Sequence, residues 1–390
     1  MEKKQNSAQQ TYALLQFFYW MGNTTICGFS SAFLLPNGFS SMEIGIIMGI
    51  GNAGAVLVQS VLADYADRTK KVTPAGILSA ICGLFLLFCG FLLVLHGRSI
   101  WMAVFYILAF IVHTIMTPLI NDLNYRLAEE GNTMNFGAAR AMGSLGYSLM
   151  SAAAGFLVER FAVRVLPILT IGSLLIMLVL LRIIGTMLRP GSRQKKEQNQ
   201  DTGGFMEFAR ANRNLLFVSL GGMCLMFCAS TCATFLLQIV LNVGGTAKDM
   251  GLALAAAAIS EIPVMMIYDR LWQRLSSGKL MKAASLGYLM KQVILFLAGG
   301  YPMVLFSQLL QCVSFALYLP SSVAYAHEHT DVKDAVKGQA LMTSMGTAAG
   351  LLASFLGGFV IDRFGVKSLL GICTAAALAG IILIFRFAED

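Results

Sequence analysis

Apolar runs of about 20 residues follow one another along most of the chain, separated by short polar stretches. A helix of that length crosses the hydrocarbon core of a bilayer, where only helices and closed barrels satisfy every backbone hydrogen bond. Charged residues make up 12% of the 390, well below the share in a soluble domain. We therefore predict an all-α protein that crosses a membrane many times.

The pattern of apolar runs predicts twelve transmembrane helices in two groups of six. These spans cover residues 11–36, 42–64, 72–96, 100–123, 135–158, 165–187, 214–243, 247–268, 280–298, 302–326, 335–361 and 368–386. The one long polar stretch, residues 188–213, is rich in charge and contains Pro-Gly and Gly-Gly pairs, as linkers do. We expect two six-helix bundles, residues 1–187 and 214–390, joined by a cytoplasmic linker.

The basic residues indicate how the chain is oriented. With a cytoplasmic N-terminus, about 19 Lys and Arg lie on the cytoplasmic side and about 6 on the exterior, as the positive-inside rule requires. This distribution explains the net charge of +8 without a nucleic-acid partner. We expect a multi-pass protein of the plasma (inner) membrane with both termini cytoplasmic. The polar start, MEKKQNSAQQ, is unlike a cleavable signal, so the first span should be retained.

Acidic residues end spans 2, 5, 8 and 11 at near-equal intervals. Asp64 and Asp269 are 205 residues apart, and Glu159 and Asp362 are 203 apart. Within each half the interval is 95 or 93 residues, so each half contains two three-helix units. Three spans per unit force the second copy to be inverted. Nested inverted repeats of this kind are found in halves of the major facilitator superfamily.

The boundary motif is fullest in GGFVIDRFGVK, which contains Asp362 and Arg363. It resembles the superfamily's loop motif of a glycine, three residues, Asp-Arg, one residue, a glycine and a base. The copy SVLADYADRTKK is degenerate but retains Asp64, and Asp269 ends span 8. Such an acid can accept hydrogen bonds from N–H groups at a neighbouring helix start and so hold one conformation. We expect this latch role, with a solvated loop acid as the alternative.

Ionisable residues also lie inside the first-half spans. Asp122 ends span 4, Arg140 lies about one turn into span 5, and Tyr147 follows Arg140 by two turns on the same face. Charges at membrane depth are costly and usually mark a solute or ion path. A guanidinium donates from a planar fork, a carboxylate accepts hydroxyls, and a ring covers an apolar C–H face. Together these groups suit a polyhydroxylated solute; a structural ion pair is the alternative.

The segment NFGAARAMGSLGY resembles span 5 of the oligosaccharide:proton symporter family, the lactose permease-like transporters. That family carries an FGxAR segment, a glycine three residues and a ring seven residues after the arginine, and an acid eighteen residues before it. The matching residues are Arg140, Gly143, Tyr147 and Asp122, although the family's acid is Glu and its ring is Trp. The resemblance implies that Asp122 and Arg140 bind sugar hydroxyls and that Tyr147 stacks on a pyranose.

The second half contributes one acid and one base within its spans. Glu261 lies about 10 Å from the cytoplasmic end of span 8, just before Pro263, which can kink the helix. The resemblance implies that Glu261 recognises solute and that Lys291, in span 9, replaces an arginine near the proton site. We therefore expect Glu261, Lys291 and Asp122 to take part in proton coupling. A Lys291–Glu261 ion pair is the structural alternative.

Span 10 departs from the family's pattern. The family has a His and, three residues later, a proton-carrying Glu, where this chain has Gln311 and Ser314. Neither side chain titrates usefully, so any proton coupling must rest on Glu261 or Asp122. His113 in span 4 is a further candidate, although it lies on nearly the opposite helix face from Asp122.

Other function classes find no support in the sequence. No phosphate-binding loop, zinc motif or nucleophile motif occurs, so we expect neither an enzyme nor an ATP-driven pump, and no cofactor or metal. The eight cysteines lie in apolar segments and imply no disulfide framework. Cys224, Cys228 and Cys232 recur every four residues, but without a nearby His or acid they are expected to be packed thiols.

We therefore expect a secondary transporter that takes up a saccharide, or a related polyol such as a nucleoside, together with protons. Solute would bind near the middle of the membrane by alternating access, and the chain would work as a monomer. An uncoupled facilitator and a proton-driven exporter of amphipathic drugs are alternatives, although span 5 lacks the Gly-Pro motif of drug antiporters. A non-transporting sensor is a third alternative, from another class.

Overall fold

The structure is a computed structural model, and it describes residues 2–68, 73–188, 204–330 and 334–389. Every regular element in these ranges is a helix. The chain divides into two compact units, Met1–Lys196 and Glu197–Asp390, and each is described by itself.

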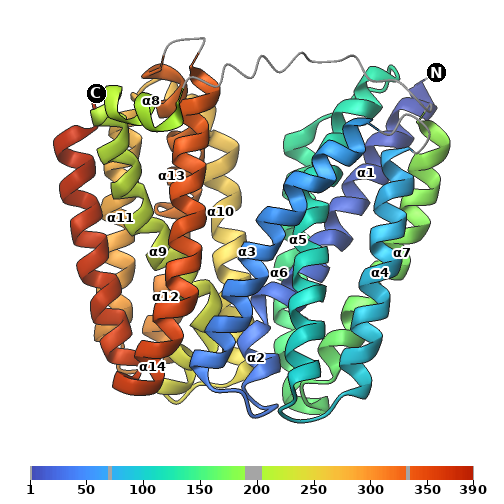
Figure 1. The fold of residues 1–390 in the computed structure, drawn as a ribbon, viewed down its shortest axis with the longest axis horizontal. Helices are drawn as coiled ribbons and strands as arrows, with labels where there is room; N and C mark the ends of the chain where they lie inside the picture. Colours follow the sequence, from blue (N-terminus) through green and yellow to red (C-terminus); the bar gives the residue numbers. More distant parts are fainter. Residues whose placement is uncertain (1, 69–72, 189–203, 331–333, 390) are drawn as a thin grey trace. The chain divides into compact units, whose positions relative to one another are not determined.

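The first unit is a bundle of long apolar helices (Figure 1). They are α1 (Glu2–Asn23), α2 (Ser30–Leu34), α3 (Ser41–Arg68), α4 (Pro74–Val94), α5 (Ile100–Glu129), α6 (Phe136–Phe161) and α7 (Val165–Met187). Thr73 and Ser99 begin α4 and α5 by accepting hydrogen bonds from the N–H groups of Gly76 and Met102. These side chains replace helical partners that the first turn lacks, so the boundaries fall at polar residues.

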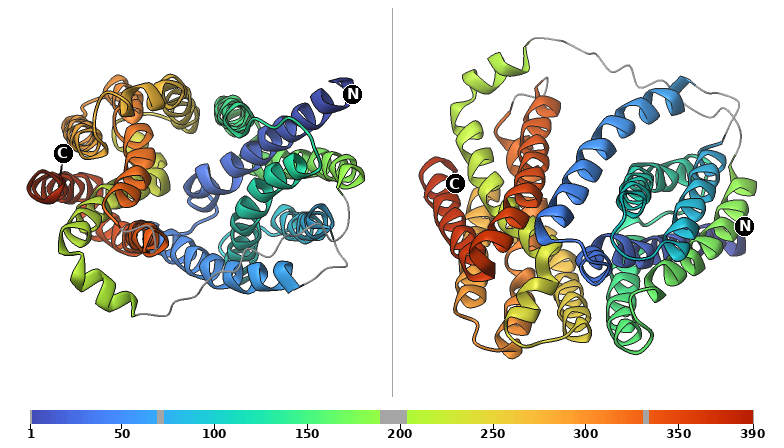
Figure 2. Two further views of the ribbon diagram at one scale, coloured as in Figure 1. Left: turned by 90° about the horizontal axis from the view of Figure 1, so that it is seen from above. Right: turned by 60° about the horizontal axis from the view of Figure 1, so that its bottom comes forward.

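The first predicted span is a broken helix. A π-helical turn, Thr24–Gly28, separates α1 from α2. Helix α1 packs along α6 and α7 (Figure 2). Gly146 makes this close approach possible, because a Cβ there would lie 3.0 Å from the backbone carbon of Phe17. Small residues allow helices to approach in the same way in other membrane bundles.

The second unit has the same kind of architecture. Its helices are α8 (Phe205–Ala211), α9 (Arg213–Asn242), α10 (Ala247–Trp272), α11 (Ser277–Leu297), α12 (Tyr301–Leu309), α13 (Phe315–Glu328) and α14 (Ala335–Phe387). Helix α8 lies within the stretch predicted as a linker, and residues 189–203 of that stretch lie outside the described residues. The core of this unit includes Leu215, Val218, Leu225, Tyr288 and Tyr318.

Two breaks divide the second unit's long helices. A 3-10 turn, Leu310–Cys312, separates α12 from α13 within predicted span 10. Gly365 divides α14 with φ 82° and ψ 169°, a conformation that only glycine adopts readily. Figure 1 shows the two arms of α14 running antiparallel from this point, which accounts for the last two predicted spans.

The described helices have the length and apolar character that a bilayer demands. Ten of them within the described residues can cross a membrane by these criteria. Helix α14 enters this set once although it contains two arms, and α1 is outside it because its first turns are polar. Large apolar side chains such as Leu57, Val61 and Val94 are at least 70% exposed, as lipid-facing residues are.

Candidate functional site

Arg140 lies near the start of α6 and stacks on α1. Its guanidinium carbon is 3.9 Å from the centre of the Trp20 ring. One guanidinium nitrogen, Nη1, donates to Ser144 Oγ at 3.1 Å. An arginine stacked on an indole gains cation–π stabilisation, and its N–H groups are directed sideways from the ring face. The stack therefore fixes the plane in which Arg140 offers its donors.

Trp20 is itself held in place by a polar network. Its Nε1 donates to Gln16 Oε1 at 3.1 Å, and Gln16 Nε2 donates to Tyr12 Oη at 2.8 Å and to Asn121 Oδ1 at 3.3 Å. Gly143 provides the room, because a Cβ there would lie 3.0 Å from Trp20 Nε1. The glycine that the family pattern places three residues after the arginine thus accommodates the indole.

The sequence prediction did not include Trp20 or Gln16. The signal was present, since Tyr12, Gln16 and Trp20 recur every four residues and so form one face of α1. Nothing local shows that this face meets Arg140, which is 120 positions further along the chain.

Tyr147 lies two turns beyond Arg140 and is half-buried. Its ring centre is 6.5 Å from that of Trp20, with an angle of 65° between the rings. The backbone carbonyl of Tyr147 accepts a hydrogen bond from Thr24 Oγ1 at 3.2 Å, which ties α6 to the π-helical turn. The structure thus places Trp20 beside both residues that were predicted on span 5.

Asp122 has a partner that the sequence prediction did not name. Its carboxylate accepts a hydrogen bond from Arg126 Nε at 2.5 Å, one turn further along α5. The Asp122 side chain is 40% exposed and that of Arg126 is 14% exposed. The neighbouring residue, Asn121, joins the network of Gln16, so this end of α5 borders the Trp20 cluster. The i, i+4 spacing of acid and arginine was the available signal.

His113 belongs to a different cluster on α1 and α5. It is buried and stacks on Tyr19 with the ring centres 4.7 Å apart. Its Nε2 lies 2.9 Å from Nδ2 of Asn23, and the Tyr19 hydroxyl bonds to that of Thr117. The hydrogen-bonding neighbours of His113 are therefore uncharged.

In the second unit, Lys291 is buried in α11 and has a specific partner. Only 4% of it is exposed, and its Nζ donates to Gln311 Oε1 at 2.5 Å. Gln311 lies in the 3-10 turn of Leu310–Cys312. The position that looked like a lost titratable residue therefore supplies a neutral acceptor for the buried lysine.

Glu261 is partly buried on α10, two residues before Pro263. It lies within electrostatic range of Lys291 and of Tyr288, which is one turn before Lys291 on α11. The Tyr288 hydroxyl is buried and has no hydrogen-bond partner within the described residues. The structure thus groups the predicted acid and base of this unit with a phenol that the sequence prediction missed.

The cysteines of α9 are packed thiols. Cys228 Sγ donates to the backbone oxygen of Cys373 at 3.1 Å, and Cys232 Sγ contacts Gln292 Oε1 at 4.0 Å. In the described part of the chain, no three His, Cys, Asp or Glu residues are arranged to hold a metal ion.

The predicted latch residues lie at helix ends or breaks. Asp362 and Arg363 are exposed on α14, just before the break at Gly365. The side chains of Asp64 and Asp269 lie outside those that the structure describes. Their latch role stays a prediction.

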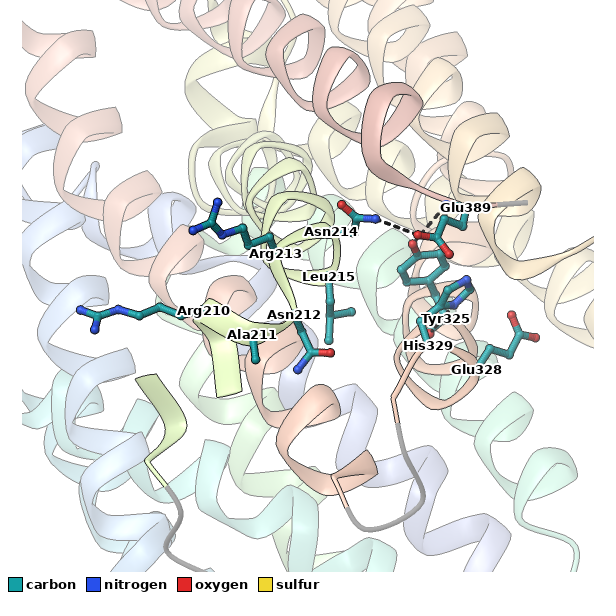
Figure 3. A pocket seen from close by; sticks show the side chains of 10 residues that line it. All are labelled: Arg210, Ala211, Asn212, Arg213, Asn214, Leu215, Tyr325, Glu328, His329 and Glu389. Carbon is teal, nitrogen blue, oxygen red and sulfur yellow. Dashed lines mark hydrogen bonds between the residues drawn. The ribbon is translucent and has the colours of Figure 1, made fainter. Parts of the chain in front are cut away.

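A separate polar pocket of about 560 Å³ lies where α9 begins and α13 ends. Figure 3 shows Asn214 and Tyr325 converging on Glu389. Asn214 Nδ2 donates to Glu389 Oε1 at 2.7 Å, and the Glu389 backbone N–H donates to Tyr325 Oη at 3.2 Å. Its described lining includes none of the residues predicted to bind solute, so this pocket is distinct from both clusters above.

Comparison with known protein families decides the class of the chain. The model described as the MFS_1 like family matches residues 10–370. The chain belongs to the MFS_1 like family. It is accordingly a multi-pass secondary transporter of small-molecule solutes and not an enzyme, as the sequence predicted. The predicted resemblance to lactose permease-like transporters is confirmed at the level of this family.

Similar proteins are transporters of several solutes. The transporter is 26% identical over 360 residues to the maltose permease of Geobacillus stearothermophilus, covering 90% of this chain and 86% of that one. It is 22% identical over 355 residues to the probable 3-phenylpropionic acid transporter of Escherichia coli (strain K12), covering 88% and 89%.

Solved structures show the same fold. The nucleoside transporter NupG superposes on the transporter with a TM-score of 0.80 at 15% identity, covering 98% of both chains. The peptide transporter POT has a TM-score of 0.72 at 12% identity, covering 99% of this chain and 95% of that one. The predicted all-α major facilitator fold is thereby confirmed.

Proposed function

We propose that the transporter takes up a neutral saccharide, or a related polyol such as a nucleoside, in symport with protons. The observation that carries this proposal is the Arg140–Trp20 stack with Tyr147 beside it. The likeness to a maltose permease supports the same solute class.

The first unit offers the groups that a sugar ring requires. The stacked guanidinium of Arg140 presents N–H donors in a fixed plane, and neighbouring sugar hydroxyls accept hydrogen bonds well from such a fork. The rings of Trp20 and Tyr147 offer apolar faces for sugar C–H groups. Asp122, held by Arg126, adds a carboxylate acceptor near the same cluster.

The second unit offers the groups for coupling. Glu261 is the carboxylate within electrostatic range of the buried Lys291, and Gln311 keeps the lysine ammonium hydrogen-bonded. We assign proton carriage to Glu261, because a carboxylate beside a buried base changes its charge at low cost when solute arrives. Lys291 then acts as the ion-pair partner of the ionised form.

The remaining expectations belong to the same proposal. The transporter lies in the inner membrane with both termini cytoplasmic, and it acts as a monomer by alternating access. Asp64, Asp269, Asp362 and Arg363 stabilise one conformation at the loop ends.

Uptake into proteoliposomes tests the solute class. We expect radiolabelled maltose to accumulate with the wild type. Arg140→Lys should lower the initial rate at least tenfold, since an ammonium lacks the planar fork, and Glu261→Gln should abolish accumulation. The matched control is Arg182→Lys, at an exposed arginine on α7. Wild-type rates with Arg140→Lys and Arg140→Ala would show that the site is wrongly assigned.

A second candidate solute is an aromatic carboxylate. The likeness to a probable 3-phenylpropionic acid transporter favours it, and a carboxylate would pair with Arg140 while the aromatic ring stacks on Trp20. Competition decides between the two: excess unlabelled 3-phenylpropionate should leave maltose uptake unchanged if the solute is a saccharide.

A further inference from the structure

We propose that α9 carries a second, uncharged contact for the solute, formed by Thr231 and Gln238, which binds hydroxyl groups. The inference rests on the proposed function and deepens it, because it assigns the residues that recognise a neutral part of the solute.

Gln238 is buried without a hydrogen bond. Only 6% of it is exposed, and neither its Nε2 nor its Oε1 has a partner within the described residues. The other buried glutamines, Gln16, Gln292 and Gln308, each have one. A buried amide that has lost water and gained no partner destabilises the fold. Its retention inside an apolar helix therefore indicates a partner that binds only in another state.

Thr231 shows the same property on the same helix. It is fully buried, and its hydroxyl has no partner in the described part of the chain. Buried helical hydroxyls elsewhere bond to the carbonyl four residues earlier, as Thr170, Ser219 and Ser354 do. The Thr231 hydroxyl has therefore not used its donor within its own helix.

The backbone between the two residues departs from a regular helix. Thr231 and Gln238 are seven positions apart, so they share one face of α9. Phe235, between them, has φ −113° and ψ 22°, outside the helical region. Gly357 of α14 packs against this ring, since a Cβ there would lie 3.1 Å from Phe235 Cδ2. Broken helices at membrane depth line cavities, and transporters build solute sites on them.

The chemistry of this face selects a neutral partner. A primary amide and a hydroxyl each donate and accept, so they complement the hydroxyls of a sugar or polyol. Beyond Arg213, at its start, α9 contains no charged residue. A carboxylate would thus find no cation on this helix, and the face favours the saccharide over the aromatic acid.

Purified full-length protein in detergent allows two measurements on each variant. The first is the Tm without solute, and the second is the Kd for maltose by calorimetry. We expect Gln238→Leu and Thr231→Val to keep or raise the Tm, because each removes a buried polar group without a partner. Each should raise the Kd about tenfold, the size of one lost hydrogen bond. Ser354→Ala, which removes a buried hydroxyl that already has a partner, should leave the Kd unchanged.

The outcomes separate this inference from the proposed function. A Tm several degrees lower in Gln238→Leu would show that the amide is already paired within the protein and would overturn the inference. An unchanged maltose Kd in both variants would also overturn it while leaving saccharide transport intact. Wild-type protein that binds neither maltose, trehalose nor uridine would refute the proposed function and this inference together.

Discussion

Trp20 controls how Arg140 can act. The indole lies against the guanidinium at 3.9 Å, and Gln16 and Gly143 determine where the indole sits. The lactose permease-like pattern places its own ring at the position of Tyr147, so this transporter combines a phenol on α6 with an indole from α1. The Arg140 cluster therefore depends on contacts between two helices.

Replacing Trp20 should weaken solute binding without removing any direct donor. A cation–π contact contributes about 0.5–2 kcal/mol, so Trp20→Leu should raise the maltose Kd roughly 2- to 30-fold. Trp20→Phe, which keeps a ring, should lie between the variant and the wild type. Calorimetry measures both. The control is Trp101→Leu, at a ring that is 61% exposed on α5, and its Kd should match that of the wild type. Tight maltose binding by Trp20→Leu would contradict the positioning role.

At the scale of elements, glycines set how closely α1 approaches α6. Gly146 lies against the backbone of Phe17, and Gly143 lies under Trp20. Elsewhere in the unit, Gly172 on α7 has nothing within 4 Å of its would-be Cβ. The same residue type therefore has a packing role at two positions and none at the third.

A pair of glycine substitutions tests this distinction. Gly143→Ala should displace the indole and raise the maltose Kd several-fold, because the new methyl group occupies the space of Trp20. Gly172→Ala should leave the Kd unchanged and increase the free energy of unfolding by up to about 1 kcal/mol, since alanine favours the helix. Thermal unfolding and calorimetry on the same samples give both quantities. Equal Kd values for the two variants would show that the Gly143 contact does not matter for binding.

Helix breaks show how far the local sequence could be interpreted. Gly365 was placed between two predicted spans, and the structure divides α14 there. The breaks at Thr24–Gly28 and Leu310–Cys312 were not predicted. Neither contains a proline or a positive-φ glycine that would mark it, and both lie inside continuous apolar runs. Hydropathy alone cannot separate a broken apolar helix from a straight one.

At the scale of the whole molecule, coupling distinguishes symport from facilitation. Adding maltose to lightly buffered, energy-depleted cells that express the transporter should make the medium more alkaline, because protons enter with the solute. Glu261→Gln should abolish this pH change and leave maltose equilibration across the membrane. A silent pH electrode at saturating maltose would indicate a facilitator, in agreement with the absence of the usual acid at Ser314.

The sequence by itself determined the membrane class, the order of the spans and the family. Apolar runs of bilayer length become helices wherever water is excluded, because each backbone N–H and C=O must find its partner within the same segment. Charges inside such runs stand out for the same reason, so Asp122, Arg140, Glu261 and Lys291 were identified as candidates from the sequence alone.

Only the tertiary structure decided which side chains these charges meet. Arg140 meets Trp20, 120 residues away, because small residues let α1 pack on α6. Lys291 meets Gln311 because a 3-10 turn directs that amide toward α11. Gln238 and Thr231 looked like ordinary polar residues until burial left them without partners. Spacing along the chain determines which residues share a helix face, whereas partners on other helices depend on packing between elements distant in sequence.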